Sequence, residues 1–184
     1  MVLLEQEIKF RIASYVEGMS LLSRLNIKVN MSRQFEQNIL YDFPDGRMFK
    51  RDEVLRLRRV DGDAWLTWKG PQQENNQHIK CRKEVETSVG DSEALLQILE
   101  SMGVIVSFRY EKYRSIFPVD DVIVALDETP IGVFIEIEGE PSCLTKIVSR
   151  LELDMKQGIG LSYPRLYERY CSETPGAPMD MVFG

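Results

Sequence analysis

The chain has 184 residues, of which 43% are hydrophobic and 28% are charged, and its formal net charge is −6 at pH 7. This ordinary globular mixture excludes disordered and fibrous proteins, and the length fits one domain but not a barrel of eight strands and eight outer helices, which needs about 250 residues. The acidic balance argues against a nucleic-acid-binding surface of the usual basic kind. Because no apolar run reaches membrane-spanning length and no signal peptide opens the sequence, we expect a cytoplasmic protein with neither a membrane nor nucleic acid as partner.

We expect one domain over residues 1–172 and a loose tail over residues 173–184, because the tail contains two prolines and two glycines. The three cysteines, Cys81, Cys143 and Cys171, are odd in number and far apart. This spacing fits neither a disulfide framework nor a zinc site, so we expect all three to be structural or incidental.

The first charged pattern is the predicted strand over residues 5–9. Alternate side chains of a strand share one face, so Glu5, Glu7 and Lys9 lie together while the residues between them face the other way. Two neighbouring carboxylates on one face can begin a divalent-cation site. A half-exposed strand that turns its charges to water shows the same alternation.

A helix and a second strand are predicted next. Ser14 and Glu17 form a capping box ahead of apolar residues at helical spacing, which predicts a helix near residues 14–26. Residues 35–43 are typical of a strand, because a Pro-Asp-Gly turn signal closes them.

The clearest local prediction is a hairpin, because two strand-like runs, 54–60 and 63–69, flank an Asp-Gly pair that favours a two-residue turn. That register sets Arg58 opposite Trp65. It puts basic side chains on one face of the hairpin and apolar side chains, which belong to the core, on the other.

The remaining sequence alternates strands and helices. The predicted strands cover residues 79–87, 106–117, 121–127 and 133–138. The predicted helices run from Asp91 to Gly103 and from Ser142 onward, and a last ordered segment covers residues 162–170. His78, the only histidine, lies in a polar loop, where we expect it to be solvated and not catalytic.

Each predicted strand carries charged side chains on one face and apolar side chains on the other. The acidic members are Glu5, Glu7, Glu84, Glu86, Asp127, Glu136 and Glu138. The basic members are Lys9, Arg56, Arg58, Lys69, Lys80, Arg82, Lys112 and Arg114. If these faces simply meet water, the strands form an open sheet or a sandwich with helices underneath, and no function follows.

Closing the sheet turns the charged faces inward. An open face would be unusually rich in charge, with few of the Thr, Ser and Tyr residues that are common on wet strand faces. We therefore predict an α+β fold, a closed eight-stranded antiparallel β-barrel or tunnel with a charged lumen and helices packed outside. Such a lumen holds only side chains or one small ligand, and its charges are costly unless they pair with each other, a metal or a ligand.

The two kinds of charge predict the chemistry of the lumen. The planar fork of arginine pairs with two phosphate oxygens at once, and lysine adds compact positive charge, so the basic side chains suit a polyphosphate. Carboxylates suit Mg²⁺ or Mn²⁺, which proteins hold with one or two carboxylates plus substrate phosphates. Together they predict phosphoryl chemistry, in which positioning and charge neutralisation do most of the catalysis.

With these residues assembled, the chain resembles the CYTH family, the triphosphate tunnel metalloenzymes, which includes class IV adenylyl cyclases, thiamine triphosphatases and inorganic triphosphatases. Residues 5–9 match the family's ExExK signature, and further motifs follow in the family's order as far as about residue 170. These motifs are Leu55-Arg56-Leu57-Arg58, Lys69 in Thr-Trp-Lys-Gly, Arg82-Lys83-Glu84-Val85-Glu86, Lys112-Tyr113-Arg114, Asp127 and Glu136-Ile137-Glu138. The signature alone is a weak pattern, whereas the ordered set is strong.

The resemblance implies that acidic residues bind one or two Mg²⁺ or Mn²⁺ ions and that basic residues bind a triphosphate. The implied metal ligands are Glu5, Glu7, Asp127, Glu136 and Glu138. The implied substrate-binding residues are Lys9, Arg56, Arg58, Lys69, Arg82, Lys112, Arg114 and Arg165, the last standing where relatives often have lysine. The implied catalytic residues are Lys9, Glu136 and Glu138. The roles of Glu84 and Glu86 stay open, because Arg82 could hold one of them as an ion-pair partner.

Three functions remain open at this point. In a triphosphatase, a metal-oriented water attacks the terminal phosphorus of inorganic, nucleoside or thiamine triphosphate. In an adenylyl cyclase, the ribose 3′-hydroxyl attacks the α-phosphorus and pyrophosphate leaves. A non-catalytic polyphosphate- or nucleotide-binding module is the third. We favour hydrolysis, because it demands less of the site and no stretch indicates a purine pocket. The oligomeric state, with a homodimer among the alternatives, also stays open.

Overall fold

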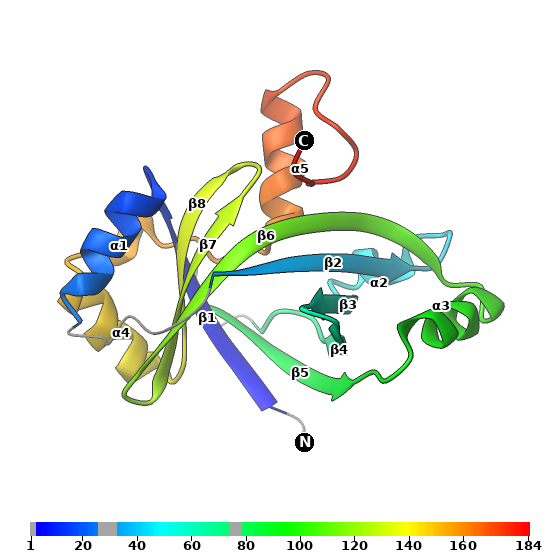
Figure 1. Cartoon of the computed structure of the whole chain (residues 1–184), viewed down its shortest axis with the longest axis horizontal. Helices are drawn as coiled ribbons and strands as arrows, with labels where there is room; N and C mark the ends of the chain where they lie inside the picture. Colours follow the sequence, from blue (N-terminus) through cyan, green and yellow to red (C-terminus); the bar gives the residue numbers. More distant parts are fainter. Residues whose placement is uncertain (1–2, 26–32, 74–78) are drawn as a thin grey trace.

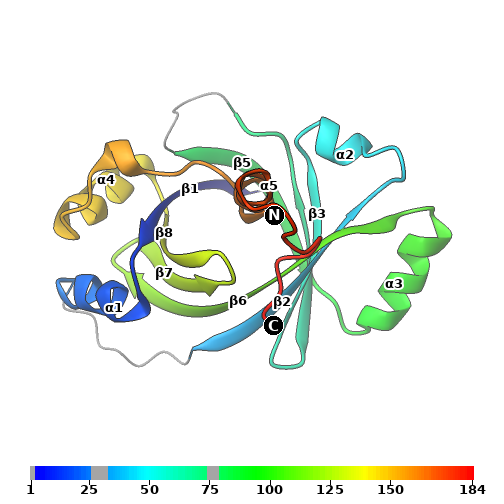
Figure 2. The same ribbon diagram turned by 90° about the horizontal axis from the view of Figure 1, so that it is seen from above.

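The computed structural model describes residues 3–25, 33–73 and 79–184, so the predicted loop residue His78 lies outside the described residues. Within them, eight strands close into one barrel in the order β1-β5-β4-β3-β2-β6-β7-β8, and every neighbouring pair is antiparallel (Figures 1 and 2). The strands are β1 (Leu3–Ile12), β2 (Gln34–Asp42), β3 (Val54–Val60), β4 (Asp63–Lys69), β5 (Lys80–Ser88), β6 (Ile105–Val119), β7 (Val122–Thr129) and β8 (Gly132–Glu138). The predicted barrel is confirmed.

The helices of the described residues pack outside this barrel or over its end. They are α1 (Tyr15–Ser23), α2 (Arg47–Lys50), α3 (Ser92–Ser101), α4 (Pro141–Arg150) and α5 (Tyr163–Glu173), with a 3₁₀ turn, η1 (Met155–Gln157). Seen from above, α5 is viewed nearly end-on over the interior of the ring of strands (Figure 2). Among the described helices, none combines the length and the hydropathy that a membrane crossing requires.

Capping signals in the sequence explain where the helices begin. The Ser14 hydroxyl accepts a hydrogen bond from the Glu17 N–H at 3.2 Å, and the Asp91 carboxylate accepts two from the first turn of α3. The helix expected to start at Ser142 begins one residue earlier. Pro141 takes the first helical position, where its missing N–H costs no hydrogen bond.

The hairpin of β3 and β4 has the predicted register, with Arg58 opposite Trp65. Asp61 and Gly62 both have positive φ, 50° and 92°, as the two central residues of a type I′ turn require. The tight turn fixes which side chains of the two strands share the inner face of the barrel.

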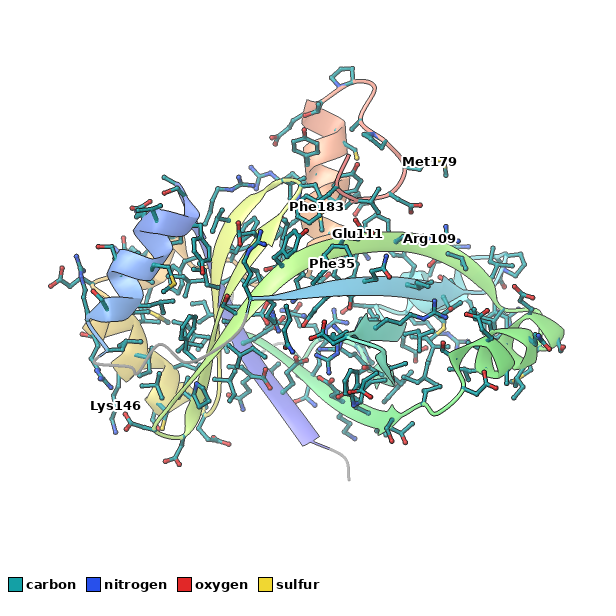
Figure 3. All side chains as sticks on the ribbon, in the orientation of Figure 1. Phe35, Arg109, Glu111, Lys146, Met179 and Phe183 are labelled. Atoms are coloured by element: carbon teal, nitrogen blue, oxygen red, sulfur yellow. The ribbon has the colours of Figure 1, made fainter. Side chains whose placement is uncertain are left out.

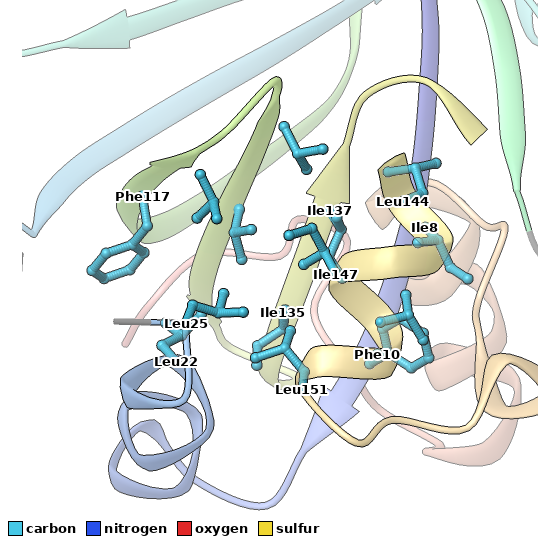
Figure 4. Close-up of a cluster of buried hydrophobic side chains, with 14 of the residues drawn as sticks. Ile8, Phe10, Leu22, Leu25, Phe117, Ile135, Ile137, Leu144, Ile147 and Leu151 are labelled. Carbon is cyan, nitrogen blue, oxygen red and sulfur yellow. The ribbon is translucent and has the colours of Figure 1, made fainter. Parts of the chain in front are cut away.

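The apolar outer faces of the strands are covered by helices. α1 and α4 pack against β1, β7 and β8, where Ile8, Ile135 and Leu144 are fully buried (Figure 4). A Cβ placed at Gly18 would lie 2.5 Å from a methyl carbon of Leu126, so glycine lets α1 approach β7 closely. Hydrocarbon therefore lies outside the ring, between strands and helices, and the interior is left to the charged faces.

The C-terminal segment, which we expected to be a loose tail because of its prolines and glycines, makes defined contacts with β6. Met181 is fully buried, its N–H donates to the Arg109 carbonyl at 2.9 Å, and its own carbonyl accepts from the Glu111 N–H at 2.9 Å. Figure 3 shows Phe183 near Phe35 at this side of β6, where the ring centroids are 6.5 Å apart. One apolar side chain with two strand-type hydrogen bonds anchors the tail. The division into a domain over residues 1–172 and a tail over residues 173–184 stays a prediction.

Candidate active site

A cavity of about 780 Å³ runs through the interior of the barrel. Most of the predicted site residues line it, and they come from six of the eight strands. These residues are Glu5, Glu7, Lys9, Arg56, Arg58, Lys69, Arg82, Lys112, Arg114, Glu136 and Glu138. The alternation of charged and apolar residues therefore identified the inner wall.

Two predicted residues are not part of that wall. Asp127 is fully buried behind it, and Arg165 borders a separate small cavity of about 50 Å³. The guanidinium carbon of Arg165 lies 3.6 Å from the ring centroid of Phe49, and one of its nitrogens lies 3.0 Å from Glu168. The structure thus brings neither the guanidinium of Arg165 nor the carboxylate of Asp127 to the tunnel.

Asp127 is surrounded by hydrogen-bond donors. Arg114 donates to its two oxygens at 2.6 and 2.5 Å, Lys112 donates at 3.1 Å, and the Tyr163 hydroxyl donates at 2.7 Å. In this structure its partners are two basic side chains and the Tyr163 hydroxyl. Its role as a metal ligand stays a prediction. Tyr163 comes from the first turn of α5, so the helix over the end of the barrel touches the interior through this residue.

The carboxylates of β1 and β5 are held by lysines. The Lys69 ammonium lies 2.6 Å from Glu5 and 3.0 Å from Glu84. Glu7 pairs with Lys80 and lies 2.9 Å from Lys9. Lys69 therefore bridges two glutamates, and Glu7 is shared by two lysines.

Arg82 takes no part in holding Glu84 or Glu86, although the sequence left that pairing open. It donates to the Asp52 carboxylate at 2.7 Å, while Glu86 accepts from Arg58 at 3.1 and 3.2 Å. Both glutamates are thus ion-pair partners of other basic residues. Sequence spacing alone did not predict Asp52, because it precedes β3 and reaches Arg82 only in the folded chain.

Arg56 is held mainly by neutral hydroxyl groups. Its guanidinium donates to the Tyr110 and Thr67 hydroxyls at 3.4 and 3.3 Å, and its ion-pair contact with Glu86 is long, at 3.8 Å. Its Nε is buried and has no hydrogen-bond partner among the described residues, as is also true of Arg58 and Arg82. These three arginines also line the cavity, and a guanidinium group there suits an oxygen-rich anion.

Negative charge is in excess at Glu138. Among the described residues its side chain has no ion pair or hydrogen bond, and burial together with repulsion from Glu5, Glu136 and Glu7 raises its pKa to about 7. Burial and then Glu7 also raise the pKa of Glu5. Clustered carboxylates with raised pKa values suit a divalent cation, because bound positive charge would favour their ionised form.

The lysines at this cluster differ in their ionisation. Burial opposes the charge of Lys9, but Glu136 and Glu7 outweigh it and raise its pKa. Burial lowers the pKa of Lys80, although Glu7 opposes the shift. Glu7 itself has a lowered pKa, because Lys80 and Lys9 outweigh the effect of its burial. Lys9 and Glu7 are therefore held charged.

These carboxylates fit Mg²⁺ or Mn²⁺, which prefer hard oxygen ligands. No group of three or more His, Cys, Asp or Glu residues in the described ranges already forms a complete metal-binding cluster. Mg²⁺ and Mn²⁺ usually keep several waters and share their coordination with substrate phosphates. The residues that could contribute are Glu5, Glu7, Glu136 and Glu138.

Some residues of the tunnel were missed by sequence reasoning. Lys80 was recognised as one of the alternating basic residues, and its shared face with Arg82 could have placed it in the site. Glu36 lies 3.4 Å from Lys112, and the alternation of β2 could have indicated it. Tyr163 carried no such signal, because helical spacing does not say which end of a helix meets a cavity.

Fold and cavity together define a class of protein, a closed β-tunnel whose lumen pairs acidic with basic side chains. The CYTH domain family matches residues 3–159, and the chain belongs to this family. A protein of Methanocaldococcus jannaschii named "Putative adenylate cyclase" is 29% identical over 177 residues, covering 95% of this chain and 99% of the relative.

Solved structures share the fold. A Vibrio parahaemolyticus protein described as a "putative adenylate cyclase" has a TM-score of 0.76 and 21% identity, with 89% of this chain and 97% of that chain covered. A Hippeastrum "putative adenylyl cyclase", described as having "a dominant triphosphatase activity", has a TM-score of 0.64 and 17% identity, with 90% and 96% covered. At these identities, the likeness supports the tunnel fold alone.

Proposed function

We propose that this protein is a divalent-metal-dependent phosphohydrolase that acts on a triphosphate bound in the tunnel. The observation that carries the proposal is one lumen whose wall combines arginine side chains with a carboxylate cluster in which Glu138 has no side-chain partner among the described residues. A triphosphate and a divalent cation suit these two sets of side chains, because the anion pairs with the guanidinium groups and the cation neutralises the acids.

The basic residues bind and orient the phosphates in this proposal. Arg56 offers a guanidinium that is held mainly by neutral hydroxyls, so it can pair with phosphate oxygens without first breaking a short ion pair. Lys69 of β4 and Arg58 of β3 add positive charge beside Arg56. Each is also ion-paired, Lys69 with Glu5 and Arg58 with Glu86, so part of its charge is already neutralised. The triphosphate is thereby aligned along β3 and β4.

Glu5, Glu7, Glu136 and Glu138 would hold the metal. A bound Mg²⁺ or Mn²⁺ supplies charge neutralisation on phosphate oxygens and polarises a water. Lys9 lies 2.7 Å from Glu136, and its raised pKa keeps it protonated. We therefore assign it to stabilising negative charge on the reacting phosphoryl group and not to removing a proton.

Asp127 and Tyr163 act as positioning residues. The phenol and the carboxylate hold Arg114, which also donates to Glu136 at 2.8 Å. This chain of hydrogen bonds fixes a cavity-lining arginine from behind the wall, and a well-fixed arginine needs no reorganisation when the phosphate arrives.

Adenylyl cyclase is the second candidate, favoured by the name of the Methanocaldococcus relative. That reaction uses the same tunnel but places the α-phosphorus at the reacting position, where the ribose 3′-hydroxyl attacks and pyrophosphate leaves. Hydrolysis stays the first candidate, because a metal-oriented water demands less of the site than the placement of a ribose hydroxyl against the α-phosphorus.

One experiment separates the candidates. The protein is incubated with Mg²⁺ or Mn²⁺ and with ATP, inorganic triphosphate or thiamine triphosphate, and the products are resolved by chromatography, with a chelator as the control. Free phosphate supports the hydrolase, and cyclic AMP with pyrophosphate supports the cyclase. Tight binding without turnover of any substrate would refute both and identify a binding module.

A further inference from the structure

Arg82 of β5 borders two cavities, the tunnel and the smaller cavity of about 50 Å³. Its side chain is only 4% exposed, so the groups that hold it decide where its charge lies. Asp52 follows α2 in the chain and borders the smaller of these two cavities. An acidic side chain from outside the tunnel therefore contacts a basic side chain of the tunnel wall.

Asp52 binds both terminal nitrogens of the Arg82 guanidinium. Its carboxylate oxygen Oδ1 accepts a hydrogen bond from Nη2 at 2.7 Å, and its backbone carbonyl accepts one from Nη1 at 3.0 Å. The other carboxylate oxygen accepts from the Gln72 N–H at 2.9 Å, which fixes the carboxylate itself. Because a guanidinium is planar and rigid, contacts at two nitrogens define its orientation.

The backbone of Asp52 has a conformation that usually requires glycine. Its φ is 56°, and it directly follows Arg51, the C-cap of α2. Its N–H donates to the Phe49 carbonyl at 3.1 Å. The Glu53 N–H donates to the Met48 carbonyl at 2.9 Å, which completes a Schellman motif. The chain thus has a carboxylate where backbone geometry favours glycine, and backbone strain of this kind is concentrated at functional sites.

An Arg82 side chain without Asp52 has another acid to pair with. Glu5 is its direct partner across the pair of β1 and β5, and both residues line the tunnel. Directly opposed residues have Cβ atoms about 5 Å apart, within reach of a long side chain. Asp52 is 40% exposed, so solvent screens its charge. Pairing with Asp52 therefore leaves more positive charge for an anion in the tunnel than pairing with Glu5 would.

We propose that Asp52 is a positioning residue for substrate binding, which acts through Arg82. It holds the guanidinium in the wall of the tunnel and away from Glu5, so that the charge of Arg82 is available to a phosphate group. This inference rests on the proposed binding of a triphosphate in the tunnel, and it holds for hydrolysis and cyclisation alike.

Calorimetric titration with inorganic triphosphate and Mg²⁺ tests this role. The variant is Asp52→Gly, because glycine adopts a positive φ freely and removes only the carboxylate. We expect Kd to rise about fivefold, and KM to rise by a similar factor with kcat nearly unchanged for whichever triphosphate is turned over. Asp52→Asn also tolerates a positive φ and keeps a neutral acceptor, so its Kd should lie between those of the parent and the glycine variant.

Asp120→Gly is the matched control. Asp120 also has a positive φ, 51°, and also pairs with an arginine, Arg150, at 3.2 Å. That ion pair is on the surface, where the aspartate side chain is 77% exposed. Asp120→Gly makes the same backbone change and also removes an ion pair, so we expect it to leave Kd unchanged.

The titration also separates positioning from a purely structural role. If Asp52 only stabilised the fold, its loss would lower the number of binding sites per chain and leave Kd as it is. A double variant tests the route through Arg82, because Asp52→Gly should add nothing to the rise in Kd that Arg82→Ala causes alone. A parental Kd in Asp52→Gly, or additive effects in the double variant, would overturn the proposal and leave the phosphate tunnel intact. If the parent binds no triphosphate, the proposed function fails as well.

Discussion

Glu138 carries the most direct prediction, because it is a glutamate in an acidic cluster with no partner among the described residues. Replacing Glu138 with Gln removes its charge at nearly constant volume. Without metal we expect this variant to be more stable than the parent at alkaline pH. In the presence of Mg²⁺ or Mn²⁺ we expect the parent to gain stability that the variant does not.

The size and sign follow from the pKa. Burial and the neighbouring carboxylates raise the pKa of Glu138 from 4.5 to about 7, so the folded chain binds more protons than the unfolded chain between those values. The free energy of unfolding therefore falls as the pH rises through this window. At about 1.4 kcal/mol per pKa unit, ionised Glu138 destabilises the parent by at most about 3 kcal/mol. Because the side chain is partly in contact with solvent, we expect the free energies of unfolding of variant and parent to differ by about 1–3 kcal/mol.

Urea denaturation at pH 5 and pH 8 measures this difference, with Glu100→Gln on the exposed face of α3 as the matched control. The variant's advantage should be small at pH 5 and full at pH 8. It should shrink again when Mg²⁺ is added, because the cation stabilises the parent. A Glu138→Gln variant that is no more stable than the parent at pH 8 would contradict the account of the acidic cluster.

Three further predictions concern the tunnel and the tail. Arg56→Ala should raise KM for the triphosphate at least tenfold, by removing a charge-assisted contact, while Arg109→Ala on the outside should not; steady-state kinetics decides. Tyr163→Phe should lower the free energy of unfolding by about 1–3 kcal/mol and reduce kcat, since it removes the hydrogen bond from the hydroxyl to Asp127. Tyr170→Phe, the control, should do neither. A Tyr163→Phe variant that matches the parent in both urea denaturation and turnover would contradict this. Met181→Ala should cost about 2–5 kcal/mol in the same denaturation assay, and a cost near zero would mean that the tail is not anchored.

Much of the barrel could be predicted from the sequence, because strand alternation is a local property. The charged residues around Glu5 and around Arg58 could each be assigned to one face of their own strand. This assignment does not require knowing which strands are adjacent in the sheet. The Asp-Gly turn also fixed the register of one hairpin, because its geometry admits few alternatives.

The distance from each side chain to the cavity could not be predicted. Asp127 has the same alternation as its neighbours, yet three donors surround it and it is fully buried. Arg165 depends on the rotation of α5, and helical spacing does not define that rotation relative to the barrel. The hairpin register set Trp65 opposite Arg58, but the sequence did not indicate that its ring borders the tunnel.

The closure of the barrel joins the beginning of the sequence to its last strand, since Glu7 lies beside Glu138 and Lys9 beside Glu136 across β1 and β8. A ribosome must therefore release nearly the whole chain before these partners can meet, and such distant pairing is the slow kind in folding. Until then both strands have a free edge, which is open to pairing with another molecule. The amount of substrate turnover would consequently measure how many molecules have paired β1 with β8. It would not count molecules that are compact but have not closed the barrel.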